Sequence, residues 1–98
     1  MENTQTCKTA ERIAIVDDEK TQMLFLCDSL RSRGYETTGF TSAREALLSL
    51  SENKYDLLLS DLTMPEMDGI TLINNALKLD PDLATVIMTG NGSIDSAV

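Results

Sequence analysis

Short apolar runs alternate with segments of helical spacing along this chain, and the alternation limits the folds open to it. Residues 12–16, 55–61 and 83–89 are rich in Val, Ile and Leu, and a shorter run lies at 35–40. Between the runs, apolar residues recur three or four positions apart, as on one face of a helix. The order β-α-β-α-β-α-β predicts an α/β fold, a doubly wound parallel sheet with right-handed crossovers and helices on both faces.

The helical segments carry start and stop signals. Gly34 stands where a C-cap glycine would end the first helix. Ser42 and Glu45 have the spacing of a capping box for the second helix. Pro81 forbids continuation of the third. Ser93 is predicted to begin a fourth helix, of which only the first turn fits before the chain ends.

The length and apolar content of the chain limit the number of domains and exclude a membrane span. Its 98 residues allow one domain, which we place at 11–98, after a polar lead-in at 1–10. The lead-in lacks the apolar stretch of a signal peptide, and no apolar run approaches the roughly 20 residues of a membrane span. We therefore expect no contact with a membrane.

Charge and cysteine usage exclude several classes of function. The net charge of −8 argues against direct nucleic-acid binding through a basic patch. Cys7 and Cys27 form neither a metal-ligand spacing nor a disulfide framework, which favours a reduced, cytoplasmic protein. The sequence has no histidine, so the usual zinc site and a Ser-His-Asp or Cys-His nucleophile are excluded.

Polar side chains follow the ends of three predicted strands. Asp17 and Asp18 follow the first, Asp61 ends the third and Thr89 ends the fourth. A doubly wound sheet binds ligands at the carboxyl ends of its strands, where the strand order switches. If the order is 2-1-3-4, these side chains converge on one pocket.

A converging set of carboxylates suggests a cation. Two unit charges about 4 Å apart repel by about 4 kcal/mol at an effective dielectric of about 20. Oxygen ligands in an open site favour Mg²⁺ or Mn²⁺, which suggests phosphoryl chemistry. Each acid alone is more simply explained as a helix or loop cap. Glu66 and Asp68 are assigned to the loop and to the start of the third helix.

The stretches IVDDE (15–19), LLLSDLTMPEMDG (57–69) and VIMTGNGS (86–93) together resemble the receiver domain of two-component response regulators. The resemblance covers residues 12–98 and implies a flavodoxin-like fold with strand order 2-1-3-4. It implies that a sensor histidine kinase or phosphotransfer protein donates a phosphoryl group to Asp61. Asp18 would bind Mg²⁺ directly and Asp17 mainly through water. The backbone carbonyl of Thr63 would complete the metal ligands, and Thr89 would be the switch hydroxyl.

The family pattern extends beyond what this sequence supplies. A fourth helix, a parallel fifth strand ending in a lysine, and a fifth helix are expected after the fourth strand. Lys54 and Lys78 lie in the wrong connections to replace that lysine. We therefore expect an incomplete receiver, truncated before its fifth strand, with an output domain beyond this chain. The fourth strand, within 83–89, would be a bare sheet edge, which predicts dimerisation or segment exchange.

Three functions remain open from the sequence. The first is a signalling phosphoacceptor, which is not an enzyme beyond catalysing its own phosphorylation and dephosphorylation. The second is a receiver-like docking module that works without phosphorylation, favoured by the missing lysine. The third is a phosphatase with an aspartate nucleophile. This third hypothesis is the weakest. Such phosphatases carry a D-x-D motif on one strand, whereas here Asp17 and Asp18 are adjacent and Asp61 is on another strand.

Overall fold

The computed structural model describes residues 11–88 and 94–96. These residues form a five-stranded sheet with the order β2-β1-β3-β4-β5. The elements in chain order are β1 (Arg12–Val16), α1 (Lys20–Arg31), β2 (Glu36–Phe40), α2 (Ala43–Glu52), β3 (Leu57–Asp61), α3 (Gly69–Leu79), β4 (Ala84–Met88) and β5 (Ile94–Ser96).

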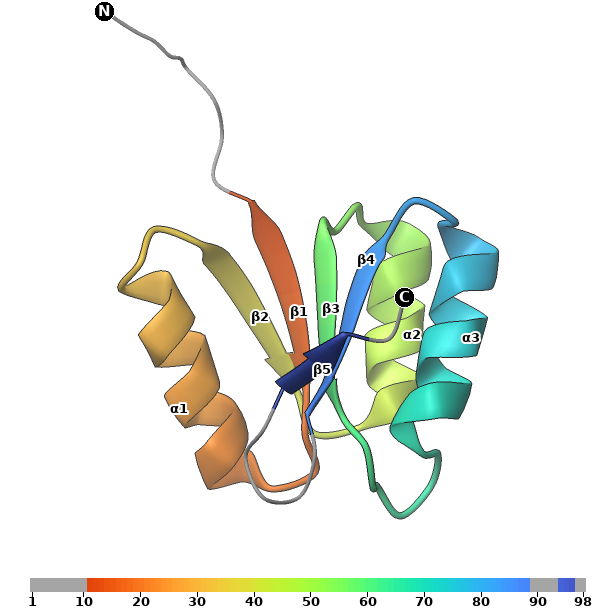
Figure 1. Cartoon of the computed structure of the whole chain (residues 1–98), viewed down its shortest axis with the longest axis horizontal. Coiled ribbons are helices and arrows are strands. Elements are labelled where there is room, and N and C mark those ends of the chain that lie inside the picture. Colours follow the sequence, from red (N-terminus) through yellow and green to blue (C-terminus); the bar gives the residue numbers. More distant parts are fainter. Residues whose placement is uncertain (1–10, 89–93, 97–98) are drawn as a thin grey trace, which may run out of the picture.

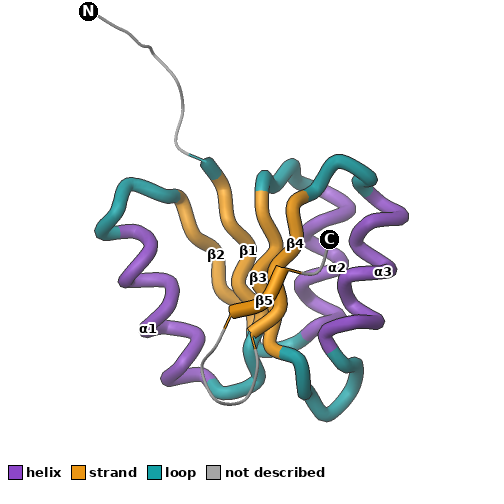
Figure 2. Tube along the Cα trace, in the orientation of Figure 1, coloured by secondary structure: helices purple, strands orange, loops and turns teal. Residues whose placement is uncertain are grey.

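The first four strands confirm the expected doubly wound parallel sheet and its order 2-1-3-4. β1 pairs in parallel with both β2 and β3, and β3 pairs in parallel with β4. The chain therefore runs outward from β1 to β2 and then returns to the other side of β1. Helix α1 covers one face of the sheet, and α2 and α3 cover the other (Figures 1 and 2).

A separate apolar cluster fills each side of the sheet. Ala14 and Val16 of β1 pack with side chains of α2 and α3, while Ile13 and Ile15 pack with Met23 and other side chains of α1. All four of these β1 residues are at most 2% exposed. A strand buried on both faces has no polar side to alternate with, which explains the continuous apolar runs of the sequence.

The connections between elements agree with most of the predicted helix starts and ends. Gly34 follows α1 with a φ of 99°, a conformation that side chains other than glycine rarely adopt. The Ser42 hydroxyl accepts a bond from the Glu45 N–H at 3.3 Å and caps α2. Helix α3 ends at Leu79, two residues before Pro81.

The segment after β4 differs from the expectation. Residues 94–96 form a short antiparallel strand against Val86–Met88, where we expected the first turn of a helix; Ser93 lies outside the described residues. A single isolated turn is unfavourable because helix nucleation is costly, whereas a sheet edge offers a ready row of backbone partners. The expectation of a bare edge is therefore wrong for Val86–Met88. Within 11–88 and 94–96, neither a parallel fifth strand nor a later helix follows.

The described part of the chain contains no helix with the length and apolar character needed to cross a membrane.

Candidate functional site

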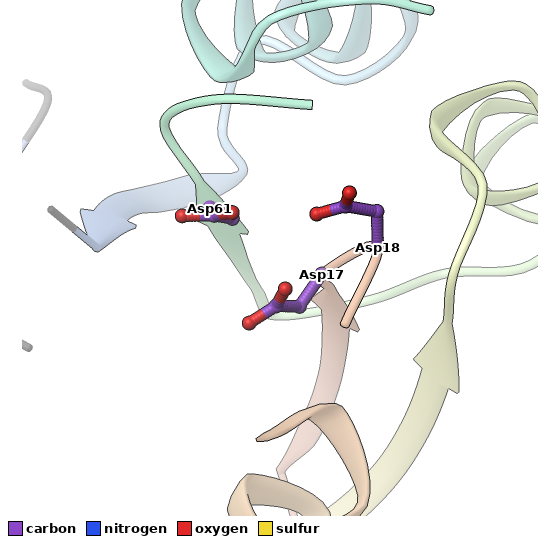
Figure 3. Close-up of side chains that lie close together, drawn as sticks. All are labelled: Asp17, Asp18 and Asp61. Carbon is purple, nitrogen blue, oxygen red and sulfur yellow. The ribbon is translucent and has the colours of Figure 1, made fainter. Parts of the chain in front are cut away.

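The pairing of β1 with β3 creates the site. Val16 lies opposite Ser60 in this parallel register. Asp17 follows Val16, and Asp61 follows Ser60. The two acids therefore lie side by side at the carboxyl edge of the sheet. Asp18 follows in the connection to α1. In Figure 3 all three side chains extend toward one shared space between the two strand ends.

The distances confirm that these three acids converge. Each of Asp17, Asp18 and Asp61 offers a carboxylate oxygen, and these atoms all lie within 4.8 Å of one another. Asp17 is 1% exposed, Asp61 is half-buried and Asp18 is exposed. The cluster therefore contains one carboxylate that is shielded from solvent and one that solvent reaches.

The simpler interpretation of the acids as helix caps is wrong for the helices that follow them. The N-cap residue of α1 is Glu19 and that of α3 is Asp68. Asp17 instead braces the turn before α1: its Oδ1 accepts a bond from the Glu19 N–H at 2.9 Å. Its own N–H donates to the Phe40 carbonyl on β2 at 3.0 Å. Asp17 is thus held through both its side chain and its backbone.

Burial and mutual repulsion perturb two of the acids. Desolvation by burial raises the pKa of Asp17, the Glu19 N–H opposes this, and the charges of Asp61 and Asp18 raise it further. Burial also raises the pKa of Asp61, with Asp18 adding to the rise, while the N–H groups of Leu62 and Thr63 oppose it. A divalent cation among these oxygens would relieve this repulsion.

The connection from β3 to α3 is shaped by a glycine. The Gly69 N–H donates to the Leu62 carbonyl at 2.8 Å, and Leu62 N–H donates to the Met88 carbonyl at 3.0 Å. A Cβ atom at Gly69 would collide with the backbone carbonyl oxygen of Asp61. Only glycine therefore lets α3 begin this close to the phosphoacceptor candidate. Met64, in the same connection, is buried in the core.

The structure tells less about two other predicted site residues, Thr63 and Thr89, than about the three acids. Thr63 is exposed in the loop two residues after Asp61, and its role as a carbonyl ligand stays a prediction. Thr89 lies outside the described residues, although Asp61 pairs with Met88, the residue before it. Lys54 is engaged elsewhere: its Nζ lies 3.3 Å from Asp80 Oδ2, in the connections that enter β3 and β4 rather than at the site.

Sequence reasoning missed one contact of the site loop. Glu66, which we assigned only to the loop, extends its Oε1 to within 2.8 Å of the Ser42 hydroxyl at the start of α2. Ser42 is distant in sequence, and no spacing rule links the two positions. The only signal was an acidic residue in a loop that the topology brings near a helix N-terminus.

The donor set fits a hard divalent cation. Mg²⁺ takes oxygen ligands, keeps several waters and is usually bound by one or two carboxylates plus a phosphoryl oxygen. A cluster of three carboxylates that is open to solvent on the Asp18 side meets these requirements. Thiolate and imidazole ligands, which softer metals prefer, are absent from this cluster.

A comparison with known families decides what kind of domain this is. The model of the response regulator receiver domain matches residues 13–98. The chain belongs to this family. Its members are signalling domains of two-component systems rather than ordinary enzymes, and they bind Mg²⁺ at an acidic pocket.

Curated relatives agree with the assignment. The response regulator receiver protein CpdR of Brucella abortus is 38% identical over 84 residues, which cover 86% of this chain and 70% of that protein. The chemotaxis protein CheY of Thermotoga maritima is 37% identical, covering 84% and 69%. The C4-dicarboxylate transport transcriptional regulatory protein DctD of Rhizobium meliloti is also 37% identical. There the match covers 91% of this receiver but only 19% of the relative.

Solved structures show the same fold. A CheY-like receiver domain from Methanospirillum hungatei superposes with a TM-score of 0.81 at 32% identity, covering 87% of this chain and 68% of the other. The regulator TrrA of Thermotoga maritima, solved in complex with Mg²⁺-BeF, gives 0.77 at 30% identity, covering 81% and 69%. The similarity thus extends to a receiver that was captured with Mg²⁺.

Proposed function

We propose that this receiver accepts a phosphoryl group on Asp61 and that Mg²⁺, held by Asp17, Asp18, Asp61 and the Thr63 carbonyl, assists the transfer. The observation that supports this most is the convergence of the three carboxylates at the end of β1 and β3. Asp61 is the half-buried member, at the tip of its strand. Asp17 is the buried member, and Asp18 is the exposed one.

The proposed reaction is a simple substitution at phosphorus. A carboxylate oxygen of Asp61 forms a bond to the phosphorus of a phosphohistidine on a sensor kinase or phosphotransfer protein. The P–N bond of the donor breaks, and its electron pair stays on the imidazole. Mg²⁺, when bound, neutralises charge on the carboxylates and on the phosphoryl oxygens. Catalysis of this kind needs positioning and electrostatics, which the fixed strand ends supply.

The output of the reaction is a change of state. Addition of a dianion at Asp61 shifts the balance between two pre-existing conformations, and we propose that the Thr89 hydroxyl takes part. The relative DctD is a transcriptional regulatory protein in which the receiver match occupies 19% of the length. By analogy we propose that this receiver controls an output domain or a separate partner.

Mass spectrometry after incubation with acetyl phosphate and MgCl₂ tests the proposal. The wild-type chain is expected to gain one phosphoryl adduct, and Asp61→Asn none. Asp28→Asn, which changes an exposed acid on α1 in the same way, is the matched control and is expected to keep the adduct. An adduct of equal yield on Asp61→Asn would place the phosphoryl group elsewhere and overturn the proposal.

A second function is supported by one observation. Lys54 is paired with Asp80, and among the described residues no lysine forms an ion pair with Asp17, Asp18 or Asp61. A docking module that works without phosphorylation would need no lysine beside the acidic cluster. In that case the wild-type chain would show no adduct with acetyl phosphate, while still binding its partner with the same affinity as Asp61→Asn.

A further inference from the structure

The loop between β3 and α3 is attached to the rest of the molecule at several points. At its end, the Asp68 carboxylate accepts a bond from the Thr71 N–H at 2.8 Å and caps α3. In its middle, Met64 is 7% exposed and packs into the core cluster that α2 and α3 share. Near its start, the Leu62 N–H donates to the Met88 carbonyl, and Met67 packs against the same cluster. Among the hydrogen bonds of the described residues, those of Glu66 link the loop to the start of a different helix.

Glu66 binds the N-terminus of α2 from outside that helix. Its Oε1 accepts a bond from the Ser42 hydroxyl at 2.8 Å and a longer one from the Arg44 N–H at 3.4 Å. The Ser42 oxygen in turn accepts from the Glu45 N–H. The first N–H groups of a helix lack internal partners and carry partial positive charge. An acid from the neighbouring loop therefore completes the cap that Ser42 begins.

The ionisation of Glu66 agrees with this geometry. The hydrogen bond from Ser42, followed by that from the Arg44 N–H, lowers the pKa of the Glu66 carboxyl. The ionised side chain has no donor of its own and can only accept, as both of these bonds require. The contact joins two segments that the sequence separates widely.

The consequence for the metal site follows from chain connectivity. Thr63, whose carbonyl is a proposed ligand, lies between Asp61, fixed in β3, and Met64, fixed in the core. Glu66, two residues after Met64, links the same loop to the start of α2. We propose that Glu66 is a positioning residue of the metal site, which holds the Thr63 backbone in place through its contact with Ser42. This inference rests on the proposed function.

Charge and position must be separated in the test. Removal of any acid from a chain with a net charge of −8 weakens its attraction for cations. Ser42→Ala breaks the same contact without changing the charge. Glu66→Gln keeps an oxygen that can accept the Ser42 bond but loses the charge. Glu52→Gln, at the far end of α2, reports the effect of charge alone.

Calorimetric titration with Mg²⁺ measures the effect directly. Glu66→Ala and Ser42→Ala are each expected to weaken Mg²⁺ binding roughly two- to tenfold, the size of one hydrogen bond's net contribution. The double variant should be no weaker than Glu66→Ala alone, because both changes remove one shared contact. Glu66→Gln should match Glu52→Gln.

Amide NMR spectra without metal provide a second measurement. Ser42→Ala and Glu66→Ala are expected to shift the amide signals of residues 62–64, which Glu52→Gln should leave in place. A purely structural cap would lower the unfolding temperature of Ser42→Ala while leaving Mg²⁺ affinity unchanged, and that result would overturn the inference. Failure of the wild-type chain to bind Mg²⁺ would overturn the proposed function and this inference together.

Discussion

At the scale of single residues, the burial of Asp17 links the site to the stability of the domain. Its carboxyl group is almost fully buried beside two other acids, and burial is the main reason that its pKa lies above the ordinary value of 3.8. A folded chain then keeps this proton at a pH where the unfolded chain has already lost it. The contribution to stability therefore falls as the pH rises from the ordinary pKa through the raised one. At neutral pH the charged Asp17 lowers the stability of the metal-free domain.

We expect Asp17→Asn to raise the free energy of unfolding of the metal-free domain at pH 7 by about 1 kcal/mol, a typical single-residue effect. The amide oxygen can still accept the bond from the Glu19 N–H, while the charge is gone. Urea unfolding in the presence of EDTA, at pH 7 and at pH 3.5, measures the change, and the gain should shrink at the lower pH. Asp28→Asn is the matched exposed control. A loss of stability at pH 7 would contradict the prediction.

A second prediction at the scale of single residues concerns Gly69. A methyl group there would meet the backbone carbonyl of Asp61, so Gly69→Ala must displace the start of α3 or the end of β3. We expect a loss of about 1–3 kcal/mol in thermal or urea unfolding, as for other overpacked sites. Asn74→Ala, on the exposed face of the same helix, should change stability by no more than about 0.5 kcal/mol. Equal effects of the two variants would show that the close approach is unimportant.

At the scale of elements, the third helix illustrates which parts of the fold were predictable. Its apolar positions and Pro81 predicted the helix and its end, because one face must be buried and proline cannot continue it. Leu72 is fully buried in the cluster of α2 and α3, whereas Ile70, also apolar, is 49% exposed. The apolar spacing of Ile70, Ile73, Ala76 and Leu77 predicts Ile70, and not Leu72, on the buried face. Ile70 is exposed because it is the second residue of α3, where the helix begins.

We expect Leu72→Ala to cost about 2–5 kcal/mol in free energy of unfolding, because a cavity remains in a packed core. Ile70→Ala on the same helix should cost less than about 1 kcal/mol. Urea denaturation followed by circular dichroism measures both. If Ile70→Ala proved the more damaging change, the exposed position of Ile70 would have to be wrong.

The strand at 94–96 shows where local signals fail. Ser93 and the residues after it carry the pattern of a helix start, which predicted a helix. The structure has a strand, because the edge of β4 supplies partners that the local sequence cannot reveal. The contact between Glu66 and Ser42 was hidden for the same reason. The positions of Asp17, Asp18 and Asp61 were predictable because a parallel sheet collects its strand ends at one edge.

At the scale of the whole molecule, the short β5 shields part of an edge that would otherwise invite association. It pairs with Val86–Met88, so dimerisation through this part of β4 requires β5 to leave. Proline cannot donate to a strand ladder and fixes its own φ. We expect Asp95→Pro to raise the fraction of dimer or larger species, as measured by light scattering over a range of concentrations.

Asp95→Ala is the matched control, since it removes the same side chain but keeps the backbone N–H. It should scatter light as the wild-type chain does. If Asp95→Pro stayed as monomeric as the alanine variant, the edge of β4 would not be an association surface, and the predicted dimerisation or segment exchange would have no basis there.

The meeting of β1 and β3 also has a consequence for synthesis on the ribosome. Asp17 and Asp18 emerge early, but the third acid belongs to a strand that follows both α1 and α2. A nascent chain stalled before β3 has left the ribosome carries two of the acids and no completed cluster. Pairing of segments so far apart comes late, because loop closure must precede it. If Mg²⁺ binds at these three acids as proposed, its binding reports that β1 and β3 have paired, and a metal-sensitive signal would time this event during translation.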